Sequence, residues 1–284
     1  MPSWVLYSLH DGVRIVTNEL PVALGGVGWR VSVGALCLAD WVLRHADLFE
    51  GRSVLELGSG LGVTGIAAAH AGAARVCLTD ALPELVGNLE RVIESNAPIQ
   101  PAASGTPCVL ECSLLDFWDG PEGVQRCASH RTMEEHLLSR QGAESSVATL
   151  PASQRFDVVL AAECCYERYH ASMLVRTIAR RLLKPNARAY VLQAVREKRP
   201  MQRGGMLAEV VSSARTEGLS LKLTAPRSGA EAPKCIVFSS TGPVAEIDEW
   251  AERVGGSGLV MLEFAWATAA NGNDGFPDSS HLQH

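Results

Sequence analysis

The residues with the clearest chemical pattern are three alternating glycines, Gly58, Gly60 and Gly62. They follow the apolar run 54–57, which contains a single acidic residue, Glu56. Glycine allows positive φ angles and lets a ligand lie directly against the main chain. A buried strand followed by a glycine turn and a helix is where an α/β sheet binds a nucleotide-like ligand. The pattern therefore predicts a binding turn for such a ligand.

A second acidic residue, Asp80, ends the next apolar stretch, residues 73–80. It stands roughly 20 residues after the glycines, the spacing at which an acid on the second strand accepts hydrogen bonds from ribose hydroxyls. Asp80 also precedes the predicted helix 82–95, so an alternative is that it caps this helix. The two roles are compatible, and we expect Asp80 to bind the ligand.

The elements that must position these residues alternate between strands and helices. Short apolar runs bounded by turn residues predict strands, and apolar residues at three- and four-residue steps predict helices, one of them capped by Ser32. The predicted strands are 4–7, 13–17, 54–57, 73–80, 108–113, 156–163, 188–194, 219–225, 235–238 and 259–267; the predicted helices are 32–44, 63–69, 82–95, 170–183, 203–217 and 244–253. This order predicts the α/β class, with a doubly wound sheet that has a mostly parallel core.

We expect one main domain, residues 25–267. Residues 1–24 are interpreted as an N-terminal β-hairpin extension, since two short strands flank the polar turn at 10–12. Residues 119–154 lack sustained periodicity and are interpreted as an insertion, because so long a loop is unusual in a compact domain. Residues 268–284 are expected to form a flexible tail.

Composition and charge narrow the classes of partner. The chain has 284 residues, of which 47% are hydrophobic and 20% are charged, as in ordinary globular proteins. Its net charge of −6 argues against wide contact with nucleic acid, which needs a basic surface. The sequence has no run of about 18 apolar residues, so no membrane span is expected.

Cysteine usage and the N-terminal residues predict an intracellular protein. None of the eight cysteines forms a C-x-x-C pair, so we expect buried free thiols and no metal site. Residues 1–24 contain charged side chains and no uninterrupted apolar segment of the secretory type. The expected location is the cytoplasm, with the nucleus as a second candidate. The protein is also expected to be a monomer.

The position of Glu56 before the three glycines distinguishes between kinds of nucleotide-like ligand. The dinucleotide fingerprint is G-x-G-x-x-G, whose tight helix start binds a pyrophosphate, whereas this chain has E-x-G-x-G-x-G. The carboxylate of Glu56 would repel a pyrophosphate but suits a ligand with a cationic amino-acid end. S-adenosylmethionine (SAM) is such a ligand, with a nucleoside, a sulfonium and an α-ammonium group. We therefore expect SAM, with the glycines against it and Asp80 on its ribose.

On these residues the chain resembles the class I, seven-β-strand SAM-dependent methyltransferases, and more narrowly their protein-lysine methyltransferase branch, methyltransferase family 16. The matching segments are 54–62, 79–80, 116–118 and 157–166, in which Glu163-Cys164-Cys165-Tyr166 fits the D/E-x-x-Y motif of that branch. The resemblance implies a Rossmann-like, doubly wound sheet of seven strands, mostly parallel with an antiparallel final strand and helices on both faces. It also implies transfer of a methyl group from SAM to a lysine side chain of a protein substrate.

The resemblance implies roles for single residues as well. Glu163 and Tyr166 would be catalytic, with Glu163 holding the incoming ammonium and Tyr166 shaping the acceptor site or hydrogen-bonding the acceptor. Trp118 would lie near the adenine, and Ala161 or Ala162, together with Glu163, would line the methyl-transfer channel. The ring of Trp29 is expected over the mouth of the glycine turn.

Several alternatives stay open. Trp29 could be a half-buried packing aromatic, and residues 163–166 could be a capped strand-to-helix turn with a packing tyrosine. Cys164 and Cys165 are interpreted as packing or channel-lining residues, because no nearby histidine suggests an activated thiolate. Fold and cofactor do not fix the acceptor, so a small-molecule methyltransferase, a dehydrogenase and an idle methyltransferase-like binding module are rival functions.

Overall fold

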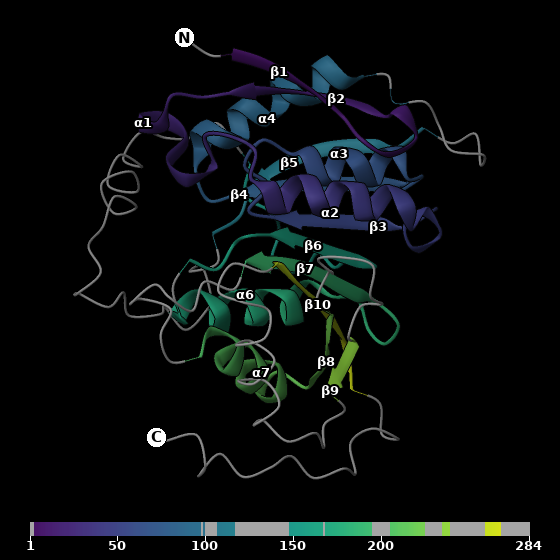
Figure 1. Cartoon of the computed structure of the whole chain (residues 1–284), viewed down its shortest axis with the longest axis vertical. Helices are drawn as coiled ribbons and strands as arrows, with labels where there is room; N and C mark the ends of the chain where they lie inside the picture. Colours follow the sequence, from purple (N-terminus) through teal and green to yellow (C-terminus); the bar gives the residue numbers. More distant parts are fainter. Residues whose placement is uncertain are drawn as a thin grey trace. The chain divides into compact units, whose positions relative to one another are not determined.

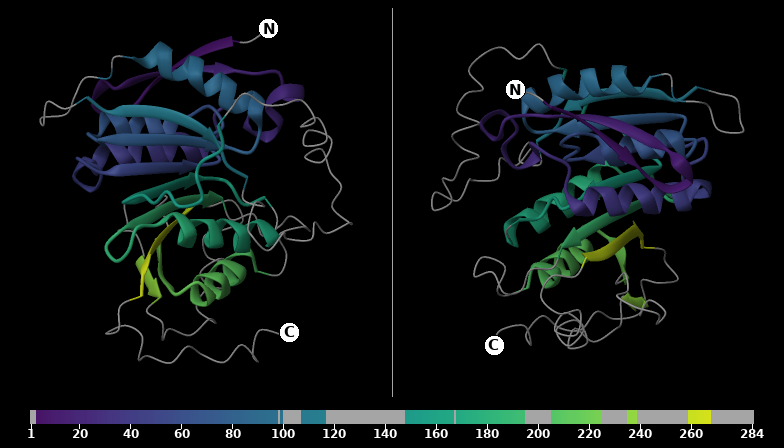
Figure 2. Two further views of the ribbon diagram at one scale, coloured as in Figure 1. Left: turned by 180° about the vertical axis from the view of Figure 1, so that it is seen from behind. Right: turned by 45° about the horizontal axis from the view of Figure 1, so that its top comes forward.

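The computed structural model describes residues 3–97, 99, 107–116, 148–166, 168–194, 205–224, 235–238 and 259–267 (Figure 1). The chain divides into two compact units, residues 1–162 and 163–284, which are described one at a time; Figure 2 shows their elements from two further directions. Most of the predicted insertion, the helix predicted at 244–253, the tail and Trp118 lie outside the described residues.

Four of the described strands form a parallel sheet in the first unit, in the order β5-β4-β3-β6. In its middle, Leu55 of β3 pairs with Cys77 of β4 on one side and with Val159 of β6 on the other. All three side chains are fully buried, as is usual for parallel strands, which have both faces covered. The strands are β3 Ser53–Leu57, β4 Arg75–Asp80, β5 Val109–Leu114 and β6 Val158–Ala162.

The main helices of the first unit are α2 Val33–Arg44, α3 Val63–His70 and α4 Pro83–Asn96. The predicted cap of α2 is confirmed, because Ser32 Oγ accepts a hydrogen bond from the Ala35 N–H at 3.0 Å. Helix α3 begins immediately after the glycine turn and is buried over residues 63–69. It packs against α2 and against the strands on either side of the turn. The turn is therefore held between a buried strand and a buried helix.

The N-terminal hairpin docks on α4, and its antiparallel strands are β1 Ser3–Ser8 and β2 Arg14–Glu19. Asn96, at the end of α4, accepts the Val16 N–H at 2.9 Å and donates to the Val16 carbonyl at 2.7 Å. Asn88, about two turns earlier, donates to the Asn18 carbonyl at 2.8 Å. The two asparagine side chains thus bond the edge of β2 as a neighbouring strand would. These bonds fix the hairpin to the first unit.

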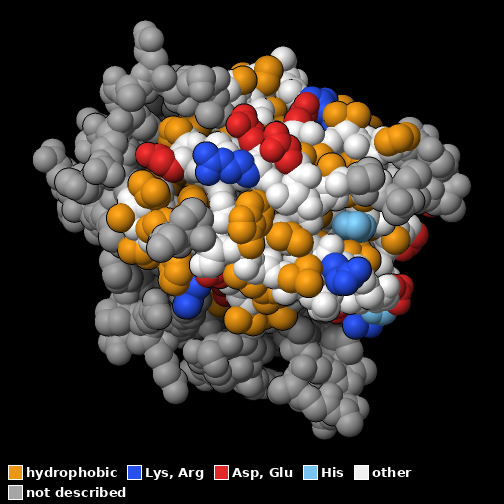
Figure 3. Space-filling view, turned by 90° about the horizontal axis from the view of Figure 1, so that it is seen from above, with side chains coloured by type: hydrophobic (Ala, Val, Ile, Leu, Met, Phe, Trp, Pro, Cys, Tyr) orange, Lys and Arg blue, Asp and Glu red, His pale blue; other side chains and the backbone are white. Residues whose placement is uncertain are grey.

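Hydrophobic side chains lie among charged ones on the face viewed in Figure 3. Among the large hydrophobic residues of the first unit, Trp4 and Leu6 on β1 are 52% and 54% exposed. Among the described residues, no single helix has the length and apolarity to cross a membrane. A pair bent by 52°, Val22–Gly28 with Val33–Arg44, meets the test by length and composition only; its first part consists of α1 Val22–Gly25 and the 3₁₀ turn η2 Gly26–Gly28.

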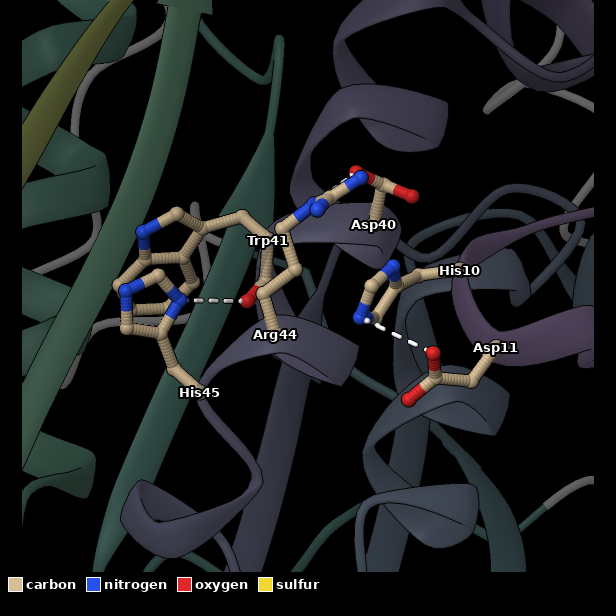
Figure 4. Close-up of polar contacts among 6 residues, drawn as sticks. All are labelled: His10, Asp11, Asp40, Trp41, Arg44 and His45. Carbon is tan, nitrogen blue, oxygen red and sulfur yellow. Dashed lines mark hydrogen bonds and ion pairs between the residues drawn. The ribbon is translucent and has the colours of Figure 1, made fainter.

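The C-terminal half of α2 carries its own group of polar contacts (Figure 4). Arg44 Nε lies 2.7 Å from Asp40 Oδ2, one turn apart on the helix. The ring of His45 stacks on Trp41 with 4.4 Å between centroids, and its Nδ1 is 2.8 Å from the Trp41 carbonyl oxygen. The Asp40–Arg44 pair is partly exposed, so water screens it and it contributes little to stability.

The second unit contains a sheet in the order β7-β10-β8-β9. Strand β10 runs antiparallel to both β7 and β8, so the predicted antiparallel final strand is confirmed. The α/β class is also confirmed, because parallel strands and helices alternate along the first unit before the antiparallel strand β10. The elements are α6 Arg168–Arg181, β7 Arg188–Ala194, α7 Met206–Thr216, β8 Leu219–Thr224, β9 Cys235–Phe238 and β10 Leu259–Trp266.

Candidate functional site

The glycine turn between β3 and α3 has the backbone conformation that its sequence predicts. Gly58, Gly60 and Gly62 have φ angles of 60°, 52° and 77°, which side chains with a Cβ rarely adopt. At Gly62 a Cβ atom would also come within 2.8 Å of Leu89 Cδ2. The turn therefore requires glycine for both conformation and space. It places main chain without side chains at the carboxyl end of β3, where α/β sheets bind ligands.

Asp80 is tied directly to this turn. Its Oδ2 accepts the Gly60 N–H at 3.0 Å, and its Oδ1 accepts the Leu82 N–H at 3.2 Å. Burial raises the pKa of Asp80, while hydrogen bonds from the N–H groups of Gly60 and Leu82 act against that rise. A carboxylate has about four acceptor positions, so Asp80 can hold the turn and still accept ligand hydroxyls.

The alternative that Asp80 caps the following helix is wrong. Helix α4 begins at Pro83, and its N-cap residue is Leu82, which makes no side-chain cap hydrogen bond. Asp80 lies too early in the chain to cap α4, and its carboxylate instead bonds Gly60 and Leu82. The structure thus brings together Asp80 and the glycine turn, which the sequence linked only by spacing.

Glu56 is buried beneath the turn, with 2% of its surface exposed. Its Oε2 accepts the Gly65 N–H at 3.0 Å, in the first turn of α3. Burial raises the pKa of Glu56 to about 7, although hydrogen bonds from Gly65, Ser59 and Thr64 oppose the rise. Its carboxyl group therefore satisfies the start of α3 and changes charge near neutral pH. A direct contact between Glu56 and a cofactor stays a prediction.

Ser59 and Thr79 connect the tips of β3 and β4, a role that the sequence analysis missed. Ser59 Oγ donates to the Glu56 carbonyl at 3.2 Å and accepts the Thr79 N–H at 2.9 Å. Thr79 Oγ1 donates to the same carbonyl at 2.7 Å. The two hydroxyls fix the glycine turn relative to the strand that carries Asp80. The available signal was a pair of buried hydroxyl residues, one inside the glycine string and one just before Asp80.

The segment before α2 also reaches the turn. Gly28 lies against Gly60, so that a Cβ on Gly28 would come within 3.3 Å of the Gly60 Cα. Its neighbour Trp29 is partly buried, and the guanidinium carbon of Arg30 lies 4.9 Å from its ring centroid. Trp29 is thus half-buried, as the packing interpretation expects. Contact between its ring and a cofactor stays a prediction.

In the second unit, residues 163–166 form an unusual turn. Glu163 is buried and has a φ of 51°, a strained conformation for a residue with a side chain. Its N–H donates to the Leu192 carbonyl at 2.8 Å. The Tyr166 N–H donates to His170 Nδ1 at 3.2 Å, and the two rings meet edge to face. The Glu163-x-x-Tyr166 segment is thus both a capped turn and a strained one.

Cys165 of this turn fits the packing interpretation, whereas Cys164 is partly exposed. Cys165 is buried, and burial raises its pKa to about 12, so it stays a thiol at neutral pH. The neighbouring His170 bonds the Tyr166 backbone through Nδ1. Ala162, partly exposed, ends β6 directly before Glu163. Within the described parts of the chain, no three His, Cys, Asp or Glu side chains are grouped as a metal site.

Comparison with known proteins finds a match to residues 15–108 of the chain. A family profile described as lysine methyltransferase matches residues 15–108, which contain the glycine turn and Asp80. These residues are similar in sequence to the lysine methyltransferase family. The segment of 163–166 lies outside the matched range.

Individual curated relatives match parts of the chain. Methyltransferase-like protein 22 of Homo sapiens is 37% identical over 108 residues, which cover 38% of this chain and 26% of the relative. Protein-lysine N-methyltransferase rrg1 of Schizosaccharomyces pombe is 29% identical over 120 residues, 42% of this chain and 38% of the relative. The chain thus spans well under two thirds of the length of these curated relatives.

The fold has a counterpart among solved structures. P. horikoshii TYW2, in complex with MeSAdo, is similar with a TM-score of 0.50 and 13% identity, covering 92% of this chain and 70% of that one. At this identity the similarity concerns the fold, which agrees with the α/β class described above.

Proposed function

We propose that this chain is a SAM-dependent methyltransferase that methylates a lysine side chain of a protein. The observation that carries the proposal is the bond between Asp80 Oδ2 and the Gly60 N–H. It joins an acid at one strand tip to a glycine turn at the next, inside the segment that the lysine methyltransferase profile matches.

The residues of the first unit fit a nucleoside cofactor. The positive φ angles of the glycine turn leave main chain bare of side chains where a ligand can lie. Asp80 would accept hydrogen bonds from the two ribose hydroxyls, and the Ser59–Thr79 contacts would keep it in register with the turn. When bound, SAM supplies a methyl group on a sulfonium, which a neutral amine can accept. No metal ion is required for that chemistry.

The residues of the second unit support an amine acceptor. A lysine ammonium has no lone pair, so it must lose a proton before it is methylated. Glu163 would attract the ammonium as it arrives, and burial around this carboxyl group favours loss of the charge on the lysine. Tyr166, at the other end of the same turn, would shape the acceptor site. Similarity to rrg1, a protein-lysine N-methyltransferase, supports a protein substrate.

Tritium labelling tests activity and acceptor class together. We expect the purified chain, incubated with methyl-tritiated SAM and cell lysate, to place label in protein bands that survive denaturing electrophoresis. Amino-acid hydrolysis should recover the label as methyl-lysine. Label only in small molecules would reject the protein acceptor, and SAM binding without any transfer would favour the idle binding module. A chain that bound NAD and not SAM would reject the methyltransferase itself.

Replacing Tyr166 with alanine is expected to separate acceptor handling from cofactor binding. The labelling rate should fall at least tenfold, because the acceptor loses its shaping ring, while the Kd for SAM in calorimetry stays within about twofold. Tyr7→Ala, on β1 of the hairpin, is the matched control and should keep both quantities. An unchanged labelling rate in Tyr166→Ala would argue against a role for this tyrosine in the acceptor site.

A further inference from the structure

Gln193 carries a buried amide on β7, where the neighbouring buried side chains are apolar or aromatic. Its side chain is 3% exposed, and its neighbours Val191, Leu192 and Ala194 are buried as well. A buried amide is costly unless its polar atoms are hydrogen-bonded. The Gln193 amide therefore needs hydrogen-bond partners inside the core.

The amide of Gln193 bonds both backbone groups of one residue, Cys165. Its Oε1 accepts the Cys165 N–H at 3.0 Å, and its Nε2 donates to the Cys165 carbonyl at 2.9 Å. The Nε2 group also donates to the Ala194 carbonyl at 3.3 Å. The orientation of the amide is chemically fixed, because an N–H and a carbonyl oxygen require opposite ends of it.

These bonds complete a set that holds the turn 163–166 along its whole length. The Leu192 carbonyl receives the Glu163 N–H, Gln193 holds Cys165, and His170 Nδ1 receives the Tyr166 N–H. Such a set can maintain the positive φ of Glu163, since a strained residue persists only where its surroundings over-determine it. Gln193 makes the two central bonds of this set.

We propose that Gln193 is a positioning residue for the acceptor site. By fixing Cys165 it keeps Glu163 and Tyr166, which lie on either side of Cys165 in the chain, in one orientation. Its effect on methyl transfer rests on the proposed function. Its hold on the turn does not, and can be measured on the protein without any reaction.

Two variants of the full chain separate the amide's hydrogen bonds from its bulk. Gln193→Leu removes both bonds at similar volume, and we expect exchange of the Cys165 amide hydrogen, followed by NMR, to accelerate at least tenfold. The rate of tritium transfer to lysate protein should fall at least tenfold, with the Kd for SAM within about twofold. Gln193→Glu keeps the acceptor but lacks a donor when ionised. Its transfer rate, relative to the parent protein, should therefore rise as the pH falls from 8 to 6 and the new carboxyl group gains a proton.

Leu223→Ala is the control for simple loss of stability. Leu223 is fully buried on β8, two places from β7 in the sheet order, and its truncation should lower Tm through a cavity without slowing transfer at 20 °C. Unchanged Cys165 exchange in Gln193→Leu would overturn the hold on the turn. Faster exchange with an unchanged transfer rate would overturn its role in the acceptor site. If the parent protein transfers no methyl group, the proposed function fails, and the exchange measurement still decides whether Gln193 holds the turn.

Discussion

Asp80→Ala should weaken SAM binding about 100-fold. The variant loses the charged acceptor for two ribose hydroxyls and frees the Gly60 N–H that orders the turn. Hydrogen bonds to charged groups contribute about 1.5–3 kcal/mol each, and a loss of about 3 kcal/mol corresponds to a factor of about 100 in Kd. Isothermal titration calorimetry at one pH and ionic strength measures the change.

Asp40→Ala is the charge-matched control for this experiment. Asp40 pairs with Arg44 on α2 (Figure 4), so its removal changes the net charge equally and leaves the glycine turn intact. The control should keep its Kd within about twofold. Asp80→Asn should give an intermediate loss, since an amide oxygen can still accept the Gly60 N–H. Undiminished binding in Asp80→Ala would remove Asp80 from the site.

Glu56→Gln should change how the free energy of unfolding depends on pH. The pKa of Glu56 is about 7 in the folded protein and about 4.5 when exposed. Between these values the folded state binds more protons than the unfolded state, so this group makes the protein less stable as the pH rises. A shift of about 2.5 units corresponds to about 3 kcal/mol. Glutamine does not titrate, so the variant should gain about 3 kcal/mol relative to the parent protein between pH 4.5 and 7.5.

Urea unfolding at a series of pH values measures this difference. Glu90→Gln, at an exposed position of α4, is the matched control and should follow the parent protein within about 0.5 kcal/mol. If the free energy of unfolding depends on pH in the same way in Glu56→Gln and in the parent protein, the pKa of Glu56 is not raised in the folded state. Glutamine can still accept the Gly65 N–H, so the comparison isolates the charge from the hydrogen bond.

The sequence by itself determined the features that depend on neighbouring residues. The glycine spacing predicted a turn with positive φ angles because only glycine adopts them without strain. Ser32 predicted the start of α2, because a cap and the N–H it bonds are three residues apart. The alternation of strands and helices predicted the α/β class, and the acid at the end of β4 was assigned to the ligand before any contact was known.

Only the tertiary structure decided which polar groups meet across the sheet. Asp80 and Gly60 are 20 residues apart, Gln193 and Cys165 are 28 apart, and Asn96 and Val16 are 80 apart. Such pairs depend on strand register and on the packing of α4, which no local pattern encodes. For the same reason the alternative that Asp80 caps a helix was wrong, and the hydroxyls of Ser59 and Thr79 and the amide of Gln193 were missed. The residue types predicted to bind a ligand can be recognised in the sequence, whereas the residues that hold them in place are revealed by the fold.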